Sequence, residues 1–289
     1  MLSLCRSRCL HIARRHCRHL CKCNQRGGGA MSGRSCREDL PTNSRVLAAF
    51  DFDMTIINQD SDSVVSQLLP REQFNADLLG LVQRCGWVVF IREVLLLLHE
   101  RGIKSLDIGN VVRRIPAVPG MLRLLRKLAR QPSLDMFIIS DANCFFIEEW
   151  LLAHGVRHLF SGIISNPATV EAQGEVMVWP YEEQTHCQHC PRNLCKGSAL
   201  HELLSSECYE RAIYVGDSCN DLCAIMRLRP MDLACIRLGL ELHSKLKTHM
   251  NAIKSSVLLF RDGHDLCELL FPANSRTIQF QPQNHYIHS

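Results

Sequence analysis

The chain has 289 residues, 46% of them hydrophobic, and a formal net charge of +4 at pH 7, which suits one core domain with an insertion, or two small domains. The positive charge is concentrated at the start, because residues 1–37 hold nine of the 33 Lys and Arg residues and precede the first acidic residue, Glu38. The other 24 basic residues are outnumbered by the 29 acidic ones, so we expect no nucleic-acid-binding face on the folded part. The longest apolar run, from Trp87 to Leu98, is interrupted by Arg92 and Glu93, so we expect no transmembrane segment.

Residues 1–44 are expected to form a disordered leader. They are rich in Arg and Cys, contain Gly27-Gly28-Gly29 and show no sustained periodicity. An acid-free, Arg-rich start is also typical of mitochondrial targeting by residues 1–30, but so many cysteines are not, and we favour an extended N-terminus with Met31 as a second start. The body contributes most of the 16 cysteines, which suggests reduced thiols and a cytoplasmic location.

The apolar run from Val46 to Phe50 predicts a buried strand at Arg45–Phe50, and Asp51-Phe52-Asp53 follows it directly. Ligands of open α/β sheets bind beyond the carboxyl ends of the strands. Because side chains alternate along a strand, Asp51 and Asp53 are expected to point the same way. Two carboxylates held so close require a cation or a shared proton. The simplest interpretation is a divalent-metal site beside a nucleophilic carboxylate.

Helical and strand patterns then alternate along the chain. Residues 61–115 repeat apolar positions at helical spacing, and 121–130 form a basic amphipathic helix. Further strands are predicted at 135–140, 162–165, 211–216 and Leu233–Arg237, with helices ending near His154 and covering 198–208, while 171–195 reads as irregular. This alternation predicts an α/β fold with a doubly wound parallel sheet.

Three of the predicted strands end in polar motifs that occur in a fixed order. The motifs are Asp51-Phe52-Asp53, Ser140-Asp141, Lys196 at the expected start of a helix, and Gly216-Asp217 followed by Asn220-Asp221. This series resembles the four motifs of the haloacid dehalogenase superfamily. The resemblance implies a Rossmann-like core at residues 45–60 and 116–271, with a helical cap inserted at 61–115. After the leader at 1–44 and this core, the polar residues 272–289 show no periodicity and are expected to form a flexible tail.

A narrower resemblance covers residues 46–271. It rests on the segments Asp51-Phe52-Asp53-Met54-Thr55-Ile56, Asn58-Gln59-Asp60-Ser61-Asp62, Ser140-Asp141-Ala142-Asn143, Ser165-Asn166-Pro167 and Cys187-Gln188-His189-Cys190-Pro191-Arg192-Asn193-Leu194-Cys195-Lys196. These segments look like the phosphoethanolamine/phosphocholine phosphatase family, which includes the similar pyridoxal phosphate phosphatases. The resemblance implies a small phosphoester as the substrate.

Each of the residues in these motifs has an expected role. Asp51 is the expected nucleophile, forming an aspartyl-phosphate, and Asp53 is the expected general acid and base. Asp51, Asp217 and, as the family implies, the backbone carbonyl of Asp53 would bind Mg²⁺ through oxygen ligands. Ser140 and Lys196 would bind the phosphate oxygens.

Two further carboxylates, Asp62 and Asp141, suggest a cationic substrate. A phosphatase pocket should be basic, so extra acids near it are explained if they bind the ammonium of ethanolamine phosphate or choline phosphate. The family resemblance places both at substrate-contacting positions. For Asp62, the alternative is that it caps the first helix of the cap.

The Cys-rich segment before Lys196 leaves two interpretations open. Cys187, Cys190 and Cys195, with His186 and His189 beside them, are ligand types for a structural zinc ion. The second CxxC pair of a zinc finger is absent, so reduced thiols that pack a loop are the alternative.

The sequence therefore predicts a Mg²⁺-dependent phosphomonoesterase acting on phosphoethanolamine or phosphocholine. The same chemistry on pyridoxal 5′-phosphate is the second candidate. A non-catalytic scaffold with a phosphatase-like fold is the third, against which the presence of Asp51, Asp53, Lys196 and Asp217 argues.

Overall fold

The computed structural model describes residues 45–272 and 275–280. The expected leader at 1–44, with its targeting alternative, lies outside the described residues, as does most of the expected tail. None of the helices in the described residues combines the length and the apolar character that crossing a bilayer requires.

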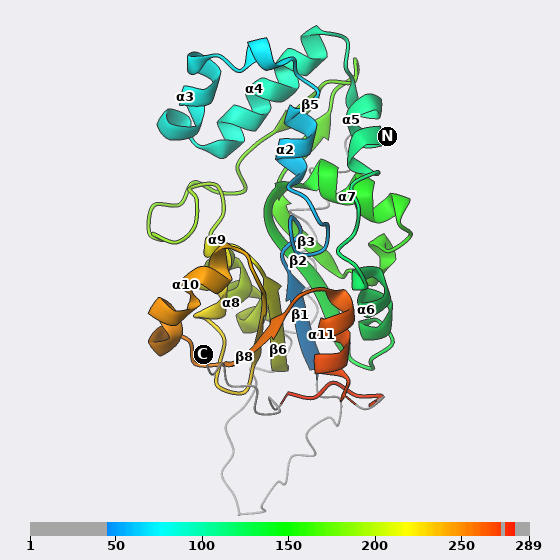
Figure 1. Ribbon diagram of the computed structural model, residues 1–289, viewed down its shortest axis with the longest axis vertical. Coiled ribbons are helices and arrows are strands. Elements are labelled where there is room, and N and C mark those ends of the chain that lie inside the picture. The colour runs from blue at the N-terminus through cyan, green and yellow to red at the C-terminus, as the bar shows by residue number, and fades with distance from the viewer. Residues whose placement is uncertain (1–44, 273–274, 281–289) are drawn as a thin grey trace, which may run out of the picture.

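A parallel sheet forms the centre of the molecule (Figure 1). Within the described residues it has six strands in the order β3-β2-β1-β6-β7-β8, each paired in parallel with its neighbours. The strands are β1 (Arg45–Phe50), β2 (Leu134–Asn143), β3 (Gly162–Asn166), β6 (Tyr209–Gly216), β7 (Leu233–Arg237) and β8 (Ser256–Phe260). The predicted doubly wound α/β fold is confirmed, and β1, which leads into Asp51, lies in the middle of the sheet.

Helices cover both faces of the sheet. On one side lie α6 (Met121–Leu128), α7 (Cys144–Ala153) and α11 (Gly263–Leu270), and on the other lie α8 (Lys196–Ser206), α9 (Cys219–Ile225) and α10 (Glu241–His249) (Figure 1). Side chains of strand β1 pack against the helices on both sides of the sheet. Ala48 and Phe50 join the apolar cluster with the first set of helices, whereas Leu47 and Ala49 join the cluster with the second set. Such burial on both faces is why β1 is an uninterrupted apolar run.

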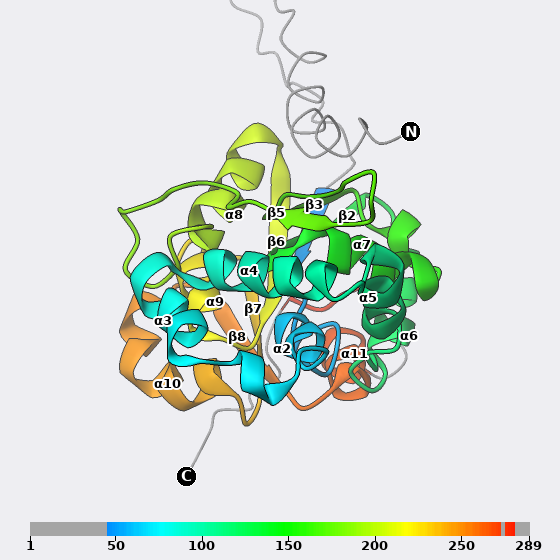
Figure 2. The same ribbon diagram turned by 90° about the horizontal axis from the view of Figure 1, so that it is seen from above.

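The segment expected to be the cap lies beyond the carboxyl edge of the sheet. It forms α2 (Ser61–Ser66), a 3₁₀ turn (Arg71–Gln73), α3 (Ala76–Cys85), α4 (Trp87–Glu100) and α5 (Ser105–Val112). Seen from above, α4 passes over the edge where the strands end (Figure 2). The helical content of this segment is as expected, while the boundaries of core and cap stay a prediction.

A small hairpin overlaps residues 171–195, which the sequence predicted to be irregular. Strand β4 (Ala168–Val170) pairs antiparallel with β5 (Val176–Val178), and β5 packs against α4. Three-residue strands are too short to show an alternating pattern, so the sequence did not indicate them. The hairpin rises from the core toward the cap helices (Figure 1).

The described part of the tail contacts the body. The Gln279 amide donates to the carbonyl of Leu270 at 2.9 Å, and Ile278 and Phe280 pack against the apolar cluster that contains α11. The guanidinium of Arg211 lies over the ring of Phe280. Over residues 275–280, this packing differs from the flexible tail that we expected, because two apolar side chains give the segment an anchor.

Candidate active site

Asp51 lies at the end of the central strand and faces α8. Its amide donates to the carbonyl of Val215 at 2.9 Å, so the pairing of β1 with β6 continues through the residue. The alternation of β1 places it on the same face as Leu47 and Ala49, which pack under α8 and α9. Only 3% of Asp51 is exposed, and its Oδ1 accepts from the amide of Phe52 at 2.7 Å.

Lys196, the first residue of α8, places a buried ammonium group beside Asp51. Its Nζ lies 2.8 Å from Asp51 Oδ2, 2.8 Å from Asp221 Oδ1 and 4.0 Å from Asp141 Oδ1, and the residue is fully buried. Burial lowers the pKa of Lys196, but the neighbouring carboxylates of Asp221 and Asp51 raise it well above the ordinary value. The ammonium group is therefore charged at neutral pH.

Carboxylates from two strand ends converge on this point. One oxygen each from Asp51, Asp217 and Asp221 lies within 4.8 Å of the others, and all three residues are buried. Asp217 follows β6 directly, as Asp51 follows β1. Its pKa is raised to about 7, first by burial and then by the charge of Asp221.

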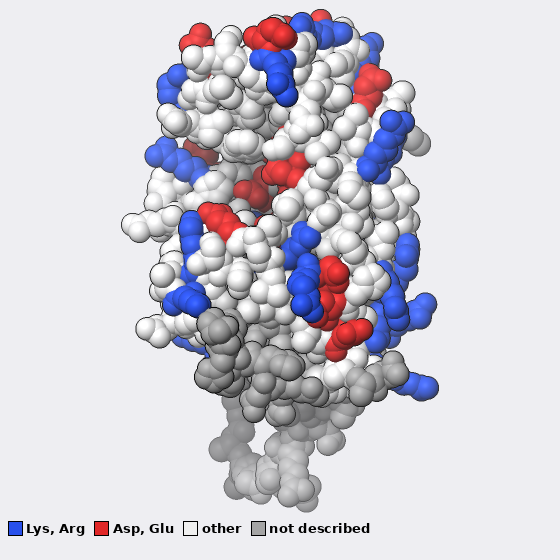
Figure 3. All heavy atoms as spheres, viewed as in Figure 1, with Lys and Arg blue, Asp and Glu red and all other residues white. Residues whose placement is uncertain are grey.

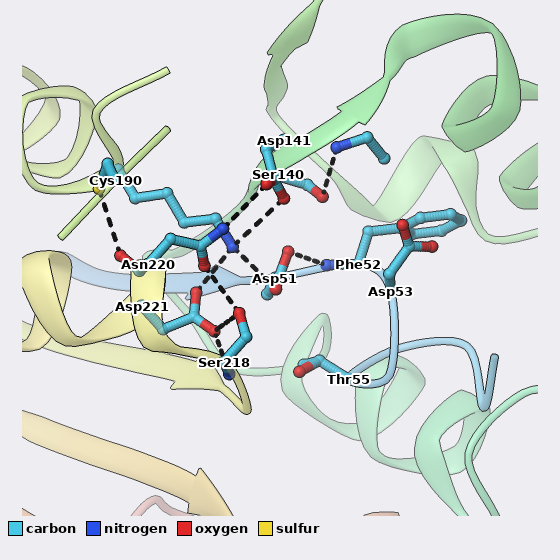
Figure 4. Close-up of polar contacts among 12 residues, drawn as sticks. Asp51, Phe52, Asp53, Thr55, Ser140, Asp141, Cys190, Ser218, Asn220 and Asp221 are labelled. Atoms are coloured by element: carbon cyan, nitrogen blue, oxygen red, sulfur yellow. Dashed lines mark hydrogen bonds and ion pairs between the residues drawn. The ribbon is translucent and has the colours of Figure 1, made fainter. Parts of the chain in front are cut away.

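Asp221 differs from the other two carboxylates because donors surround it (Figure 4). Its Oδ1 accepts from Lys196 and from the Tyr214 hydroxyl, each at 2.8 Å. Its Oδ2 accepts from the amides of Asp217 and Ser218 at 3.0 and 2.9 Å and from the Ser218 hydroxyl at 3.1 Å. With its lone pairs used in this way, Asp221 holds Lys196 and the start of α9 in place, as expected of a residue outside the metal's own ligand set.

The remaining donor set fits a hard divalent cation. Burial raises the pKa of Asp51 well above its usual range; the charge of Lys196 lowers it, and the charges of Asp221 and Asp217 raise it further. One ammonium does not balance three buried carboxylates, so a cation that binds Asp51 and Asp217 would remove an uncompensated repulsion. Carboxylate oxygens are the ligands that Mg²⁺ prefers.

A tight turn after Asp53 brings Thr55 to the same point. Met54 has a φ of 54°, in the left-handed region that residues other than glycine seldom adopt. The guanidinium of Arg237, at the end of β7, donates to the Met54 carbonyl and, at 2.6 Å, to Asn58 Oδ1. The Thr55 hydroxyl then donates to Asp217 Oδ1 at 2.9 Å. Arg237 was not singled out in the sequence, since an Arg at a strand end has no distinctive pattern.

Asp53 lies apart from the three grouped carboxylates. Its side chain accepts from the amide and the hydroxyl of Ser61, at 3.0 and 3.1 Å, at the start of α2. Burial, followed by the charges of Asp60 and Asp62, raises the pKa of Asp53 well above its usual range. Figure 4 shows its carboxylate separated from that of Asp51. This side chain is therefore not part of the acidic group, whereas the expected metal contact was through its backbone carbonyl.

Only one of the two carboxylate oxygens of Asp62 has a hydrogen-bond partner. Oδ2 accepts from Trp87 Nε1 at 2.6 Å, while Oδ1 is buried without a hydrogen-bond partner. Burial, and then the charge of Asp60, raises the pKa of Asp62 to about 8. The alternative role as a helix cap is wrong, because Asp60 caps α2 by accepting from the amide of Ser63 at 2.6 Å. Trp87 was missed as a site residue because α4 was recognised only as an apolar run.

Ser140 and Asp141 reach the site from the carboxyl end of β2. Ser140 is fully buried and its Oγ accepts from the amide of Ala142 at 3.3 Å. Asp141 is more exposed, and its Oδ2 accepts from the Asn220 side chain at 2.9 Å. Asp141 Oδ1 lies 4.0 Å from Lys196 Nζ, and Ser140 directly precedes Asp141 at the end of β2. On the face shown in Figure 3, acidic side chains gather in a recess near the middle of the molecule.

The Cys-rich loop contains a second cluster, and its composition differs from the expectation. Sulfur atoms of Cys187, Cys190, Cys195 and Cys223 all lie within 4.8 Å of one another. Cys223 was missed because it lies on α9, far from the loop in sequence. The neighbouring histidines are engaged elsewhere, His186 beside the Ser198 hydroxyl at 3.2 Å and His189 against the ring of His249.

The fold is shared with a solved hydrolase of the haloacid dehalogenase (HAD) type. A HAD family hydrolase, t0658 from Salmonella enterica subsp. enterica serovar Typhi, superposes with a TM-score of 0.54 over 81% of this chain and 73% of its own, at 15% identity, which shows the fold.

Sequence comparison shows the family. The family model described as Putative Phosphatase matches residues 46–273. Pyridoxal phosphate phosphatase PHOSPHO2 of Mus musculus is 32% identical over 231 residues, covering 77% of this chain and 95% of the mouse protein. The phosphoethanolamine/phosphocholine phosphatase of Homo sapiens is 32% identical over 230 residues, covering 78% and 85%. The chain belongs to this phosphatase family and is a phosphatase.

Proposed function

We propose that the protein hydrolyses small phosphomonoesters with Mg²⁺, through a phosphorylated Asp51. The observation that carries the proposal is the buried ammonium of Lys196, 2.8 Å from Asp51 at the end of the central strand. It holds the carboxylate of Asp51 in a fixed position and offers positive charge where a phosphate dianion would approach.

In the first step, a carboxylate oxygen of Asp51 attacks phosphorus and the bond to the ester oxygen breaks. Lys196 and the Ser140 hydroxyl bind the equatorial phosphate oxygens and stabilise their charge during transfer. Asp53 gives its proton to the departing alcohol. The raised pKa of Asp53, caused first by burial, supports this role because a general acid must carry its proton before the reaction.

In the second step, the carboxylate of Asp53 takes a proton from water, and the resulting hydroxide attacks the phosphorus of the aspartyl-phosphate. Asp51 departs as a carboxylate and inorganic phosphate is released. The hydrogen bonds from Ser61 to Asp53 stabilise the ionised form that this step requires.

Asp51, Asp217 and the backbone carbonyl of Asp53 would hold the Mg²⁺ ion. When bound, it neutralises charge on the carboxylate cluster and on the transferring phosphoryl group. Thr55 orients Asp217 for this task through its hydroxyl.

We propose that the alcohol part of the substrate carries a cation, as in phosphoethanolamine and phosphocholine. The support is the buried, unpartnered Oδ1 of Asp62. Trp87 fixes the other oxygen of Asp62 and, with Phe90, lines a cavity of about 710 Å³ beside α2. An ammonium near Asp62 would satisfy the orphaned oxygen, and aromatic faces also attract quaternary ammonium groups.

Pyridoxal 5′-phosphate is the second candidate substrate. It is favoured by the mouse relative, whose name gives that activity and which is as similar to this chain as the human phosphoethanolamine/phosphocholine phosphatase. Its phosphate would occupy the same position against Lys196, so the two candidates differ only in the group that faces the cap.

A phosphate-release assay over phosphoethanolamine, phosphocholine, pyridoxal 5′-phosphate and neutral esters tests both proposals. We expect turnover only with Mg²⁺, and a kcat/KM for the cationic esters at least tenfold above that for glycerol phosphate. Equal, slow rates on every ester would contradict the substrate proposal. Full activity of Asp51→Asn on the best ester would contradict the proposed reaction.

A further inference from the structure

The four clustered cysteines have the spacing of a metal site. Cys187 Sγ lies 3.4 Å and Cys195 Sγ 3.7 Å from Cys223 Sγ, and all pairs in the cluster are within 4.8 Å. Sulfur ligands about 2.3 Å from a tetrahedral zinc ion are separated from each other by about 3.8 Å. The cluster is thus close to the size that a zinc ion requires, and its sulfurs are unbridged, since these cysteines are free thiols.

Backbone amides are arranged around the sulfurs as they are around metal-bound thiolates. The amides of His189 and Cys190 donate to Cys187 Sγ, as in a turn that carries two ligands three residues apart. The amide of Lys196 donates to Cys190 Sγ, and that of Gly197 to Cys223 Sγ. Donors of this kind stabilise thiolate charge and orient the ligands. Four thiols that only filled space would have no need of them.

Buried polar side chains hold the loop in this conformation. The Gln184 amide donates to the carbonyls of Cys187, Cys190 and Pro191 and accepts from the amide of Cys187, and only 3% of Gln184 is exposed. Glu182 accepts from the amide of Cys195 at 2.7 Å. These hydrogen bonds hold the backbone of Cys187, Cys190 and Cys195 in place independently of contacts among the sulfurs themselves.

The cluster also joins the two helices that position the catalytic lysine. Cys195 directly precedes Lys196, and Cys223 lies two residues after Asp221, which accepts from Lys196. The approach of α8 to α9 is close: a Cβ on Gly197 would lie 2.4 Å from Cys223 Sγ.

We propose that Cys187, Cys190, Cys195 and Cys223 bind one structural Zn²⁺ ion, which ties the start of α8 to α9 and so keeps Lys196 against Asp51. A tetrahedral set of four sulfur ligands selects zinc or iron over the hard cations that suit the carboxylate site. Zinc needs no redox partner and closes such a site with no open position. The site lies outside the acidic group and has a different ligand chemistry.

Elemental analysis of the purified full chain tests the site. Protein from zinc-supplemented cultures, purified without chelator, is expected to hold one Zn²⁺ per chain. Cys223→Ser should lose most of it. Cys267→Ser is the matched control, because Cys267 is also buried, 8% exposed against 5% for Cys223, but lies in α11 outside the cluster. The double variant Asp51→Asn/Asp217→Asn should keep its zinc, which separates this site from the acidic one.

A second measurement covers the case in which Cys223→Ser does not fold. The parent protein, stripped of metal by a mercurial reagent and dialysed against Co²⁺ with reductant, should show thiolate-to-cobalt charge-transfer absorption and the strong visible bands of tetrahedral cobalt. Absence of these bands from folded protein, no zinc in the parent, iron in its place, or a disulfide among the four cysteines would each overturn the proposal.

The link to Lys196 has its own readout. Removal of zinc should speed hydrogen exchange at the amides of α8 (Lys196–Ser206) by at least tenfold while leaving β7 (Leu233–Arg237) unchanged. Equal exchange at α8 with and without zinc would show that the ion does not hold this helix.

Discussion

Lys196 shows how the chemistry of the site depends on burial. A fully buried ammonium is costly unless it is paired, and here it contacts the carboxylates of Asp51 and Asp221 at 2.8 Å. Asp221 is in turn held by Tyr214 and by the amides at the start of α9. Because Tyr214 and these amides fix Asp221, and Asp221 fixes Lys196, the ammonium group is already in position before a phosphate binds.

The Asp62→Asn substitution tests the cation-binding role at the scale of one residue. Asn keeps the bond from Trp87 but removes the charge, so we expect the KM for phosphocholine to rise about 10- to 100-fold. Steady-state kinetics check this, with p-nitrophenyl phosphate, which lacks a cation, as the control substrate. An unchanged KM for phosphocholine would exclude Asp62 from substrate binding.

The pKa of Asp62, raised to about 8, also predicts a pH dependence. Below that pH, Asp62 of the free enzyme holds a proton, and this proton must leave before a cation binds. The KM for phosphocholine should therefore fall as pH rises toward 8 and then level off. The charge of choline does not titrate. Asp62→Asn should lose this dependence, and its persistence in the variant would assign it to another group.

At the scale of elements, the close contact of α6 with α11 holds one side of the sheet together. A Cβ on Gly263 would lie 2.3 Å from the amide of Met121 and 2.5 Å from the carbonyl carbon of Gly120, both backbone atoms that cannot move aside cheaply. We expect Gly263→Ala to lower the free energy of unfolding by about 1–3 kcal/mol in urea titrations.

Gly80→Ala is the matched control for that substitution. Gly80 lies in α3, where an added Cβ would meet only the flexible end of the Arg84 side chain. The better helix propensity of Ala should then stabilise the protein by up to about 1 kcal/mol. The same sign of change in both variants would contradict the packing argument.

The sequence predicts elements well where one local pattern decides them. Strands Arg45–Phe50 and Leu233–Arg237 match the expected bounds because both are buried on two faces and read as unbroken apolar runs. Strand β2 runs on to Asn143, past the expected end at residue 140, since pairing with Asn166 in β3 supports polar residues there. Strand β8 was missed, although its apolar residues are similar to those of β7.

Residues brought together by tertiary packing were harder to predict. The strand-end motifs locate Asp51, Ser140 and Asp217, because parallel strands bring their carboxyl ends to one edge of the sheet. Lys196 was located by the helix expected to start there. Trp87 and Cys223 have no such pattern. They reach Asp62 and the cysteine loop only through the placement of α4 and α9.

Across the molecule, buried carboxylates gather at the carboxyl edge of the sheet, beneath α4 (Figure 2). The pKa of Asp217, raised to about 7 by burial and by Asp221, means that its ionisation opposes folding of the metal-free protein. Stability of that form should therefore fall as pH rises from about 4 through 7, and Mg²⁺ should restore it.

Thermal unfolding of Asp217→Asn tests whether the charge of Asp217 destabilises the metal-free protein. At pH 8 without metal, the variant should be more stable than the parent by on the order of 1 kcal/mol, because the buried charge is gone. For the parent, Mg²⁺ at a hundred times its Kd should add about 2.7 kcal/mol, whereas the variant should respond little. A full Mg²⁺ response in Asp217→Asn would place the ion elsewhere.

Trapping of the phosphoenzyme tests directly whether Asp51 becomes phosphorylated. Asp53→Asn should still react with p-nitrophenyl phosphate and Mg²⁺, since that leaving group needs no acid, but should lose the base that activates water, which is worth about 10²- to 10⁴-fold. After a denaturing quench, mass spectrometry is predicted to find one hydroxylamine-labile phosphoryl group on Asp51, absent from Asp51→Asn/Asp53→Asn. A phosphoryl group on another residue, or continued p-nitrophenol release by the double variant, would show that Asp51 is not the nucleophile.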